Sequence, residues 1–302
     1  MSKVLITGGS GLLGSNIAKL ATSKFEVYAT YNKNKVSMKD VYFFRINLTK
    51  KDELVKIEQI KPDFIIHCAA LTNVDYCEDN PNEAYNQNVI ASVNTAEISQ
   101  KIGAYLIHIS TDSVFDGTKG DYTEYDMPNP INVYGRTKLE AEQKISLLHP
   151  HSCIVRTNIY GWNKRDKFSL AEWMLNKLTN NEELPALKDI YFSPILVNDL
   201  VEALFKLQVK KYEGIIHIAG SEICSKLDFA YMIAEVFDLN DSLIKPVVAD
   251  EIKLKAKRGK KLSLNVSRAE EIFNLRLPNI KEGLGKMKRI HEEGYVENLK
   301  YG

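Results

Sequence analysis

The stretch Thr7-Gly8-Gly9-Ser10-Gly11-Leu12-Leu13-Gly14 decides the fold of this chain. It follows a short apolar run and opens a segment of helical period, and its glycines fit both G-x-x-G-x-x-G from Gly8 and G-x-G-x-x-G from Gly9. Glycines at this spacing permit a tight turn and a close backbone approach to a pyrophosphate, while the following helix offers unpaired N–H groups. We therefore expect a dinucleotide to lie against Gly8, Ser10, Gly11, Leu12 and Leu13.

Short apolar runs rich in β-branched residues alternate with helical segments through the first half of the chain, which is typical of a parallel sheet with crossover helices. The pattern predicts strands at residues 4–7, 26–30, 42–46, 64–67, 105–110 and 153–156. Helices are predicted near residues 12–23, 51–59, 81–102 and 133–147. The six strands predict one open, doubly wound α/β sheet of the Rossmann type.

The alternation loosens after Arg156. We expect a helix near residues 170–178, a helix from about Pro194 to Leu207, a strand at residues 215–219, a helix capped by Ser225, and two helical segments ending near Gly294. This organisation predicts a Rossmann domain of residues 1–160 plus about 190–220. A smaller substrate-binding lobe would comprise residues 161–189 and 221–302.

Composition favours a small-molecule partner. The 302 residues are 44% apolar and 26% charged, and 40 basic residues balance 39 acidic ones, so no global field favours nucleic acid or an anionic membrane. No apolar run reaches the roughly 18–20 residues of a membrane span. The start lacks a signal-peptide pattern, and four scattered cysteines suggest neither a zinc site nor a disulfide framework. We expect a cytoplasmic monomer or homodimer without a bound metal.

The segment after the second predicted strand bears on the choice of cofactor. A site that prefers NAD usually places an acid there to bind the ribose 2′-hydroxyl, but residues 30–35 read TYNKNK and contain none. A cation can instead bind a 2′-phosphate. We expect NADP(H) to be preferred, with NAD(H) possible, Tyr31 and Asn32 beside the cofactor, and Lys33 on the phosphate. The alternative is that Lys33 is a solvated loop lysine.

The spacing Tyr-x-x-x-Lys occurs three times, beginning at Tyr31, Tyr134 and Tyr160, so context must choose among them. Only Tyr134 and Lys138 begin a plausible helix, where residues four apart share one face. They also follow the run Ser110-Thr111-Asp112 at the end of the fifth predicted strand, the edge where open α/β sheets bind ligands. Thr111, Tyr134 and Lys138 are therefore the candidate catalytic residues.

The chemistry of carbonyl reduction explains these residue types. Hydride delivery to a ketone leaves an alkoxide, which must receive a proton as charge develops. Tyr134 can supply the proton, but the reference pKa of tyrosine is about 10, and we expect the Lys138 ammonium and an oxidised nicotinamide to lower it. Lys138 could also hold the nicotinamide ribose, and Thr111 would donate a hydrogen bond to the ketone oxygen.

With these residues placed, the chain resembles the extended short-chain dehydrogenases, and most closely their dTDP-4-dehydrorhamnose reductase branch. The matching pieces are residues 7–14, AALTNVD (69–75), STDSVFDG (110–117), PNPINVYGRTKL (128–139), Arg156-Thr157 and the 189–194 segment. The resemblance implies NAD(P)H-dependent reduction of a 4-keto-6-deoxy sugar nucleotide at its C4 ketone, with Tyr134 as proton donor, in deoxysugar and polysaccharide biosynthesis.

The resemblance also implies further site residues. Cys68, Ala69, Ala70 and Thr72 would line the cofactor, and Asn47 and Leu48 would flank the adenine. Val74, Asp112, Ser113 and Phe115 would face the substrate. The chain departs from the family pattern at two of these positions, because Asn47 replaces an aspartate and Ser113 replaces a tyrosine.

Two residues outside these motifs are candidate substrate contacts. Trp162 could stack on the sugar or merely plug the hinge between the lobes. The basic run at residues 253–261 could draw a sugar diphosphate toward the site, and Arg258 is its candidate contact. A solvated surface is the alternative for this run.

Two other classes of function compete with a reductase. Sugar-nucleotide 4,6-dehydratases that resemble this family carry Thr-Asp-Glu where this chain has Thr111-Asp112-Ser113, and epimerases that recycle bound NAD more often show an acid after the second strand. The other alternative is a non-catalytic NADP-binding subunit, because the regulatory β subunit of methionine adenosyltransferase resembles the same branch. The intact Thr111, Tyr134 and Lys138 set favours catalysis.

Overall fold

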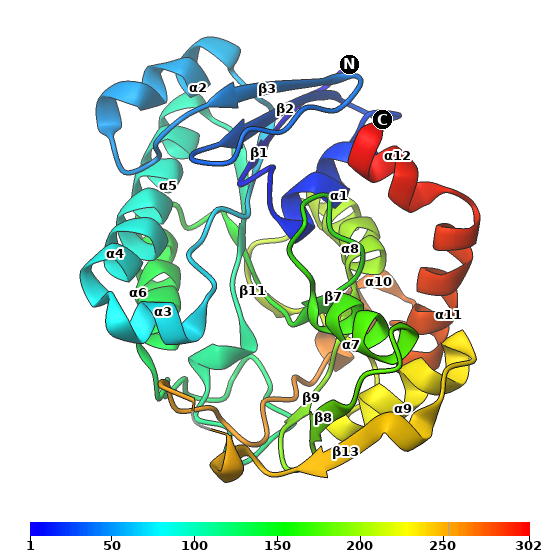
Figure 1. Ribbon diagram of the computed structural model, residues 1–302. Helices are drawn as coiled ribbons and strands as arrows, with labels where there is room; N and C mark the ends of the chain where they lie inside the picture. The colour runs from blue at the N-terminus through cyan, green and yellow to red at the C-terminus, as the bar shows by residue number, and fades with distance from the viewer. Residues whose placement is uncertain (253) are drawn as a thin grey trace.

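The computed structural model describes residues 1–252 and 254–302, and a seven-stranded parallel sheet lies at its centre (Figure 1). In spatial order its strands are β11 (Gly214–His217), β6 (Cys153–Arg156), β5 (Tyr105–Ile109), β4 (Phe64–His67), β1 (Lys3–Thr7), β2 (Glu26–Tyr31) and β3 (Val41–Arg45). The chain adds β2 and β3 on one side of β1 and the later strands on the other, so the strand order reverses between β1 and β4. This reversal is the switch point of a doubly wound sheet, and the Rossmann-type fold is confirmed.

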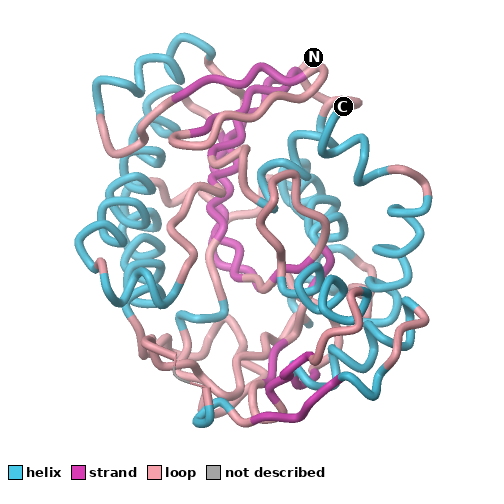
Figure 2. Tube along the Cα trace, viewed as in Figure 1, coloured by secondary structure: helices cyan, strands magenta, loops and turns pink. Residues whose placement is uncertain are grey.

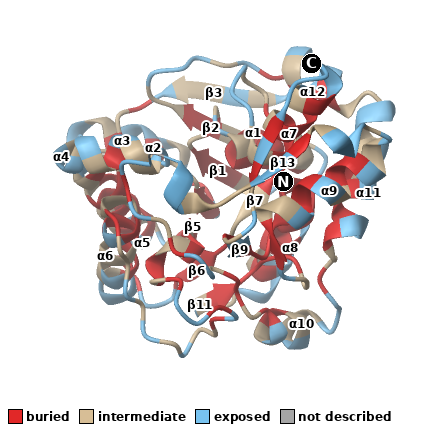
Figure 3. Cartoon of the chain, turned by 60° about the horizontal axis from the view of Figure 1, so that its bottom comes forward, coloured by how far each residue is buried: buried red, intermediate tan, exposed pale blue. Residues whose placement is uncertain are grey.

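The predicted six-stranded sheet is one strand short. The segment near residues 215–219 forms β11, which pairs in parallel with β6 through Ile215 and Ile154. The strands β4 and β6 are buried along their whole length, as expected for a sheet covered by helices on both faces. Figure 3 shows buried residues toward the middle of the molecule and exposed ones on its outside.

Helices form a layer on each face of this sheet (Figure 2). One face is covered by α1 (Leu12–Ala21), α8 (Val197–Lys210) and α12 (Tyr295–Tyr301), and the other by α2 (Val55–Ile60), α5 (Ala91–Ile102) and α6 (Val133–Leu148). The amphipathic α8 buries Leu200, Leu204 and Leu207 in the core of the first face. The loops that follow the strands therefore begin at strand ends that are fixed between two apolar cores.

The helix predicted over residues 81–102 is continuous but irregular. It consists of α4 (Pro81–Tyr85), one π turn (Asn86–Ile90) and α5, and Gly103 ends it in the left-handed conformation at φ 72°. A π turn inserts one residue into the helical repeat and redirects a side chain. Here it places Asn88 in the interior, next to the loop after β4.

A second apolar core lies beyond the sheet and packs α7 (Leu170–Thr179), α9 (Lys226–Phe237) and α11 (Ile280–Glu292) around short strand pairs. The pairs are β8 (Leu184–Leu187) with β13 (Ile244–Val247), β9 (Tyr191–Phe192) with β12 (Cys224–Ser225), and β7 (Ile159–Tyr160) with β10 (Ile195–Leu196). Ser225 caps α9 through a reciprocal bond with Asp228, which confirms the predicted cap.

Two helices were not predicted. The six-residue α3 (Val74–Asp79) follows β4, and α12 follows the two predicted terminal segments, α10 (Ser267–Phe273) and α11. Their polar sequences give little helical period, and α12 is held by tertiary contacts of Val296 and Leu299. Among the residues that the structure describes, no helix is long and apolar enough to cross a membrane.

Candidate active site

The glycine-rich loop after β1 is closely packed. Gly8 is left-handed at φ 67°, and a Cβ there would lie 2.8 Å from the backbone of Ala69 on the loop after β4. A Cβ on Gly14 would lie 2.3 Å from the Gly8 oxygen. Both positions therefore require glycine, and the loop closes tightly against the start of α1.

The first turn of α1 has the features of an anion site. Gly11 is its N-cap, and in the described part of the chain no side chain caps this end and no acid lies in its first turn. The amides of this turn remain available to anionic oxygen, and the helix dipole favours negative charge there. The residues present thus fit the pyrophosphate of a dinucleotide. That Gly8, Ser10, Gly11, Leu12 and Leu13 bind it stays a prediction.

The loop after β2 holds the predicted contacts of the adenosine ribose. Lys33 has a 77% exposed side chain that lies 3.4 Å from Glu83, so its cation is free to reorient. Arg45, which is paired in register with Tyr31, donates from Nε to the Asn32 carbonyl at 3.2 Å. Sequence reasoning missed Arg45, because only the pairing of β2 with β3 brings this cation beside the loop.

The predicted adenine-flanking pair has two different environments. The Asn47 Oδ1 atom accepts from the amide and hydroxyl of Thr49, at 3.1 and 2.8 Å, so it stabilises its own turn. Leu48 is buried in the core between the sheet and α5, and its carbonyl accepts from Asn94.

The loop of residues 68–73 is fixed by Asn88, a residue that sequence reasoning missed. Its side-chain amide bonds both polar atoms of the Leu71 backbone, at 2.7 and 3.2 Å, and donates to Thr137 on α6 at 3.0 Å. Cys68, Ala69 and Ala70 are partly buried on this loop, and Thr72 is exposed. The amide therefore locks the predicted cofactor-lining loop to the helix that carries Tyr134.

Thr111, Tyr134 and Lys138 meet at the carboxyl edge of the sheet, as predicted. Thr111 follows β5 and lies close to the phenol of Tyr134, which is in the first turn of α6, while the Thr111 hydroxyl donates to Asp112 at 3.1 Å. Lys138 lies one turn further and is 2% exposed, and its Nζ donates to the Ile109 carbonyl at 2.8 Å and contacts His108 Nε2 at 3.2 Å. The catalytic roles of the three residues stay predictions, but their proximity is a property of the structure.

The electrostatics of this group differ from the expectation in one respect. Burial raises the pKa of Tyr134, the nearby Thr111 hydroxyl opposes that shift, and Asp112 adds to it. Burial lowers the pKa of Lys138 to about 8, against the influence of Glu142. The phenol is therefore held protonated, which suits a proton donor, and the expected lowering of its pKa by Lys138 is not seen.

Two features fix the position of the start of α6. Asn132 caps the helix by accepting from the Gly135 amide at 2.8 Å and reaches the Lys257 carbonyl with its Nδ2 at 3.0 Å. Gly135 lies so close to the turn after β5 that a Cβ there would be 2.1 Å from the Ser113 oxygen. Glycine next to Tyr134 thus lets the helix approach the Thr111 segment.

Of the predicted substrate residues, Asp112 is buried and hydrogen-bonded by Asn158, and its pKa is raised by burial. Ser113, which donates to Asp112, and Val74 are partly exposed. Phe115 is 1% exposed and stacks on Tyr122 in the core of the sheet domain, with the ring centroids 4.1 Å apart. Its contact with substrate stays a prediction.

Trp162 and Arg258 are both engaged within the protein. The Trp162 indole donates to the Met287 carbonyl at 3.0 Å and packs against both the sheet core and the lobe core, which favours the hinge alternative. Arg258 lies 3.1 Å from Asp75. Sequence reasoning missed Lys226, which begins α9: burial lowers its own pKa, and its charge opposes the rise that burial causes in the pKa of Asp112. Lys253 of the basic run lies outside the described residues.

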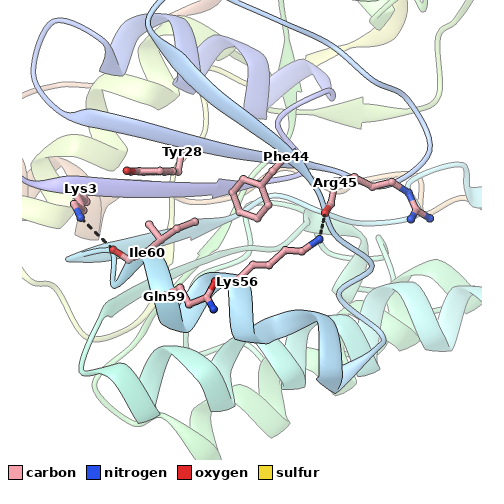
Figure 4. Close-up of a pocket in the computed structure, with 7 residues that line it drawn as sticks. All are labelled: Lys3, Tyr28, Phe44, Arg45, Lys56, Gln59 and Ile60. Atoms are coloured by element: carbon pink, nitrogen blue, oxygen red, sulfur yellow. Dashed lines mark hydrogen bonds between the residues drawn. The ribbon is translucent and has the colours of Figure 1, made fainter.

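A groove of about 490 Å³ lies between β2, β3 and α2 (Figure 4). Its lining residues are Lys3, Tyr28, Phe44, Arg45, Lys56, Gln59 and Ile60, and none of the predicted catalytic residues is among them. The Arg45 side chain extends away from the groove, while its carbonyl accepts from Lys56 at 3.2 Å. The groove is separate from the candidate active site.

A doubly wound sheet with a glycine-rich loop after β1 and a Thr–Tyr–Lys group at its carboxyl edge defines the class of extended short-chain dehydrogenases. The model of the RmlD substrate binding domain family matches residues 2–292, and the chain belongs to that family. The match covers both the sheet and the lobe.

Similar proteins include dTDP-4-dehydrorhamnose reductases and beta subunits of methionine adenosyltransferase 2. The chain is 30% identical to a dTDP-4-dehydrorhamnose reductase of Aggregatibacter actinomycetemcomitans, over 97% of this chain and all of that one. It is 33% identical to the methionine adenosyltransferase 2 subunit beta of Bos taurus, over 89% of this chain and 82% of that one. The structure of a Bacillus anthracis dTDP-4-dehydrorhamnose reductase in complex with NADP superposes with a TM-score of 0.85 at 30% identity, covering 96% of this chain and all of that one.

Proposed function

We propose that this protein reduces the C4 ketone of a 4-keto-6-deoxy sugar nucleotide with NADPH. The observation that carries the proposal is that Thr111 and Tyr134 lie together at the carboxyl edge of the sheet, with buried Lys138 one turn further along α6. The similarity to dTDP-4-dehydrorhamnose reductases over nearly the whole chain supports the substrate class.

Each of the three residues has a separate role in the proposed reduction. A bound nicotinamide supplies the hydride. Thr111 donates a hydrogen bond to the ketone oxygen and orients it, and Tyr134 gives its phenolic proton to that oxygen as the alcohol forms. Lys138 holds the nicotinamide ribose hydroxyls with the hydrogen of its ammonium that remains after its bonds to Ile109 and His108.

The preference for NADPH rests on charge at the ribose end. No acid follows β2, and Lys33 and Arg45 lie at its carboxyl end, where a 2′-phosphate would approach. The relative from Bacillus anthracis whose structure contains NADP adds support.

The proposal is tested by NADPH oxidation at 340 nm with an enzymatically prepared 4-keto-6-deoxy sugar nucleotide, with NADH measured alongside. We expect turnover by the wild type and a loss of roughly a hundredfold or more in Tyr134→Phe, which lacks only the transferable proton. Cofactor fluorescence should show unchanged NADPH binding in the variant. NADPH binding without reduction of the sugar would instead favour a non-catalytic subunit, as in the alternative above.

A further inference from the structure

A row of polar side chains crosses the carboxyl end of three neighbouring strands. Thr7 of β1 is paired in register with His67 of β4, and His67 with His108 of β5. All three are 0–1% exposed, and the two imidazoles stack with their centroids 5.3 Å apart. Because residues in register on parallel strands share a face, the row runs from the glycine-rich loop to Lys138.

The hydrogen bonds fix the proton positions at one end of the row. Ser92 gives its only hydroxyl hydrogen to the Asn88 carbonyl at 2.6 Å, so it accepts from His67 Nε2 at 3.0 Å. His67 Nδ1 is then an acceptor and receives the Thr7 hydroxyl at 2.7 Å, while Thr7 accepts from the Ala69 amide at 3.3 Å. Burial and the charge of Lys138 lower the pKa of His67 to about 3, so the ring is neutral.

The other end of the row meets Lys138. An ammonium has no acceptor lone pair, so His108 Nε2 accepts from Lys138 and the proton of the neutral ring lies on Nδ1. Among the described residues, His108 Nδ1 is buried without a partner. An apolar side chain would avoid the free-energy cost of that unpaired atom. His108 is therefore less favourable for stability than an apolar residue would be, and what it provides instead is the contact of its Nε2 atom with Lys138.

We propose that His108 is a positioning residue for Lys138: its Nε2 atom holds the lysine ammonium, and the stacked His67, tied to Thr7 and Ser92, holds the His108 ring. This contact and the bond to the Ile109 carbonyl fix two of the three N–H bonds of the Lys138 ammonium. The third N–H bond then points out of the sheet. The part of the inference that concerns turnover rests on the proposed function. The placement of the proton on His108 does not.

The first test reads the tautomers without any turnover. Long-range ¹H–¹⁵N spectra of the full-length protein, with His108→Gln used to assign the signal, are expected to show the proton of His108 on Nδ1 and that of His67 on Nε2. A His108 ring protonated on Nε2 at neutral pH could not accept from Lys138 and would overturn the proposal.

The second test compares two amide substitutions. Gln can place a polar atom near the position of Nε2, whereas the shorter Asn cannot reach it. We expect His108→Asn to lower kcat about ten- to a hundredfold, as for the loss of a hydrogen bond to a charged group, and His108→Gln to stay within about threefold of the wild type.

The matched control is His217→Gln, which changes another buried histidine whose Nδ1 contacts the Tyr122 carbonyl rather than Lys138. We expect it to lower thermal stability and leave kcat unchanged. Equal kcat values for His108→Asn and His108→Gln, in folded proteins that bind NADPH, would contradict the positioning role. If the wild type reduces no sugar nucleotide, the proposed function fails, and the spectra still decide the contact.

Discussion

At the scale of single residues, the most unusual group is Lys138, a lysine that is 2% exposed and whose ammonium contacts a carbonyl and an imidazole rather than a carboxylate. Burial disfavours its charged form and lowers its pKa to about 8. A buried cation without a carboxylate partner is costly to stability, which makes a functional role the better explanation.

This pKa predicts how reduction depends on pH. The ammonium is present below about pH 8 and is lost as the pH rises through that value, so kcat should fall over the same range. Tyr134 stays protonated there, because its own pKa is raised. Steady-state kcat at saturating NADPH, measured across this pH range, tests the expected fall. A kcat that stays flat well above pH 8 would contradict the role of the Lys138 ammonium.

The candidate site was predictable at this scale where residues share one helix. Tyr134 and Lys138 are one turn apart, so spacing alone places them together. Asn88 and Arg45 were missed because a π turn and strand register create their contacts. The burial of Phe115 was not predictable, since a sequence motif does not show which face of a turn is buried.

At the scale of elements, the placement of α6 decides whether the site forms. Its first turn carries Tyr134, and its contact with the turn after β5 is closer than any side chain at position 135 would allow. Asn132 joins the same helix start to the backbone at Lys257. The helix is thus located from both the sheet and the lobe side.

Gly135→Ala tests this placement. The added methyl group would overlap the Ser113 oxygen and push α6 away from Thr111, and we expect kcat to fall about a hundredfold, as for other misplacements of about 1 Å. Gly285→Ala is the matched control. A Cβ there meets nothing within 4 Å among the described residues, so it should stabilise α11 by about 0.5–1 kcal/mol without affecting kcat. Equal kcat values in the two variants would refute the placement.

The elements themselves follow the sequence closely where their hydrophobic period is strong. β4, β6 and the cap of α9 occur as predicted. The pairing of β11 with β6 could not be read from a local pattern, because it depends on how the chain returns from the lobe. The same holds for α12, whose few apolar residues gain their burial from tertiary packing against α1, α11 and the adjoining core.

At the scale of the whole molecule, the end of the chain returns to the sheet domain. Leu264, Ala269 and Leu299 lie in the core under α1 and α8, and Tyr295 donates to Asn16 of α1 at 2.7 Å. The predicted division gives all of residues 221–302 to the lobe. We propose instead that the lobe comprises α7, α9, α11 and their strands, while α10 and α12 belong to the sheet domain.

Leu299→Ala tests whether α12 belongs to the sheet domain. Leu299 is 0% exposed, so its truncation should cost about 2–4 kcal/mol in the free energy of unfolding. Leu275→Ala, at a leucine that is 55% exposed, should change it by no more than about 0.5 kcal/mol. Urea unfolding followed by circular dichroism measures both. Similar small effects would mean that α12 contributes little to the sheet domain.

The central claim, hydride delivery to a sugar ketone, is tested most directly by following the hydride itself. NADPH deuterated at the transferred position of nicotinamide C4 is incubated with the protein and a 4-keto-6-deoxy sugar nucleotide, and the product is analysed by mass spectrometry and NMR. The account predicts one deuterium at the sugar C4 carbon, with a matching amount of NADP⁺, and almost none with Tyr134→Phe. A sugar nucleotide that remains a ketone, or is altered without taking up deuterium, would contradict it.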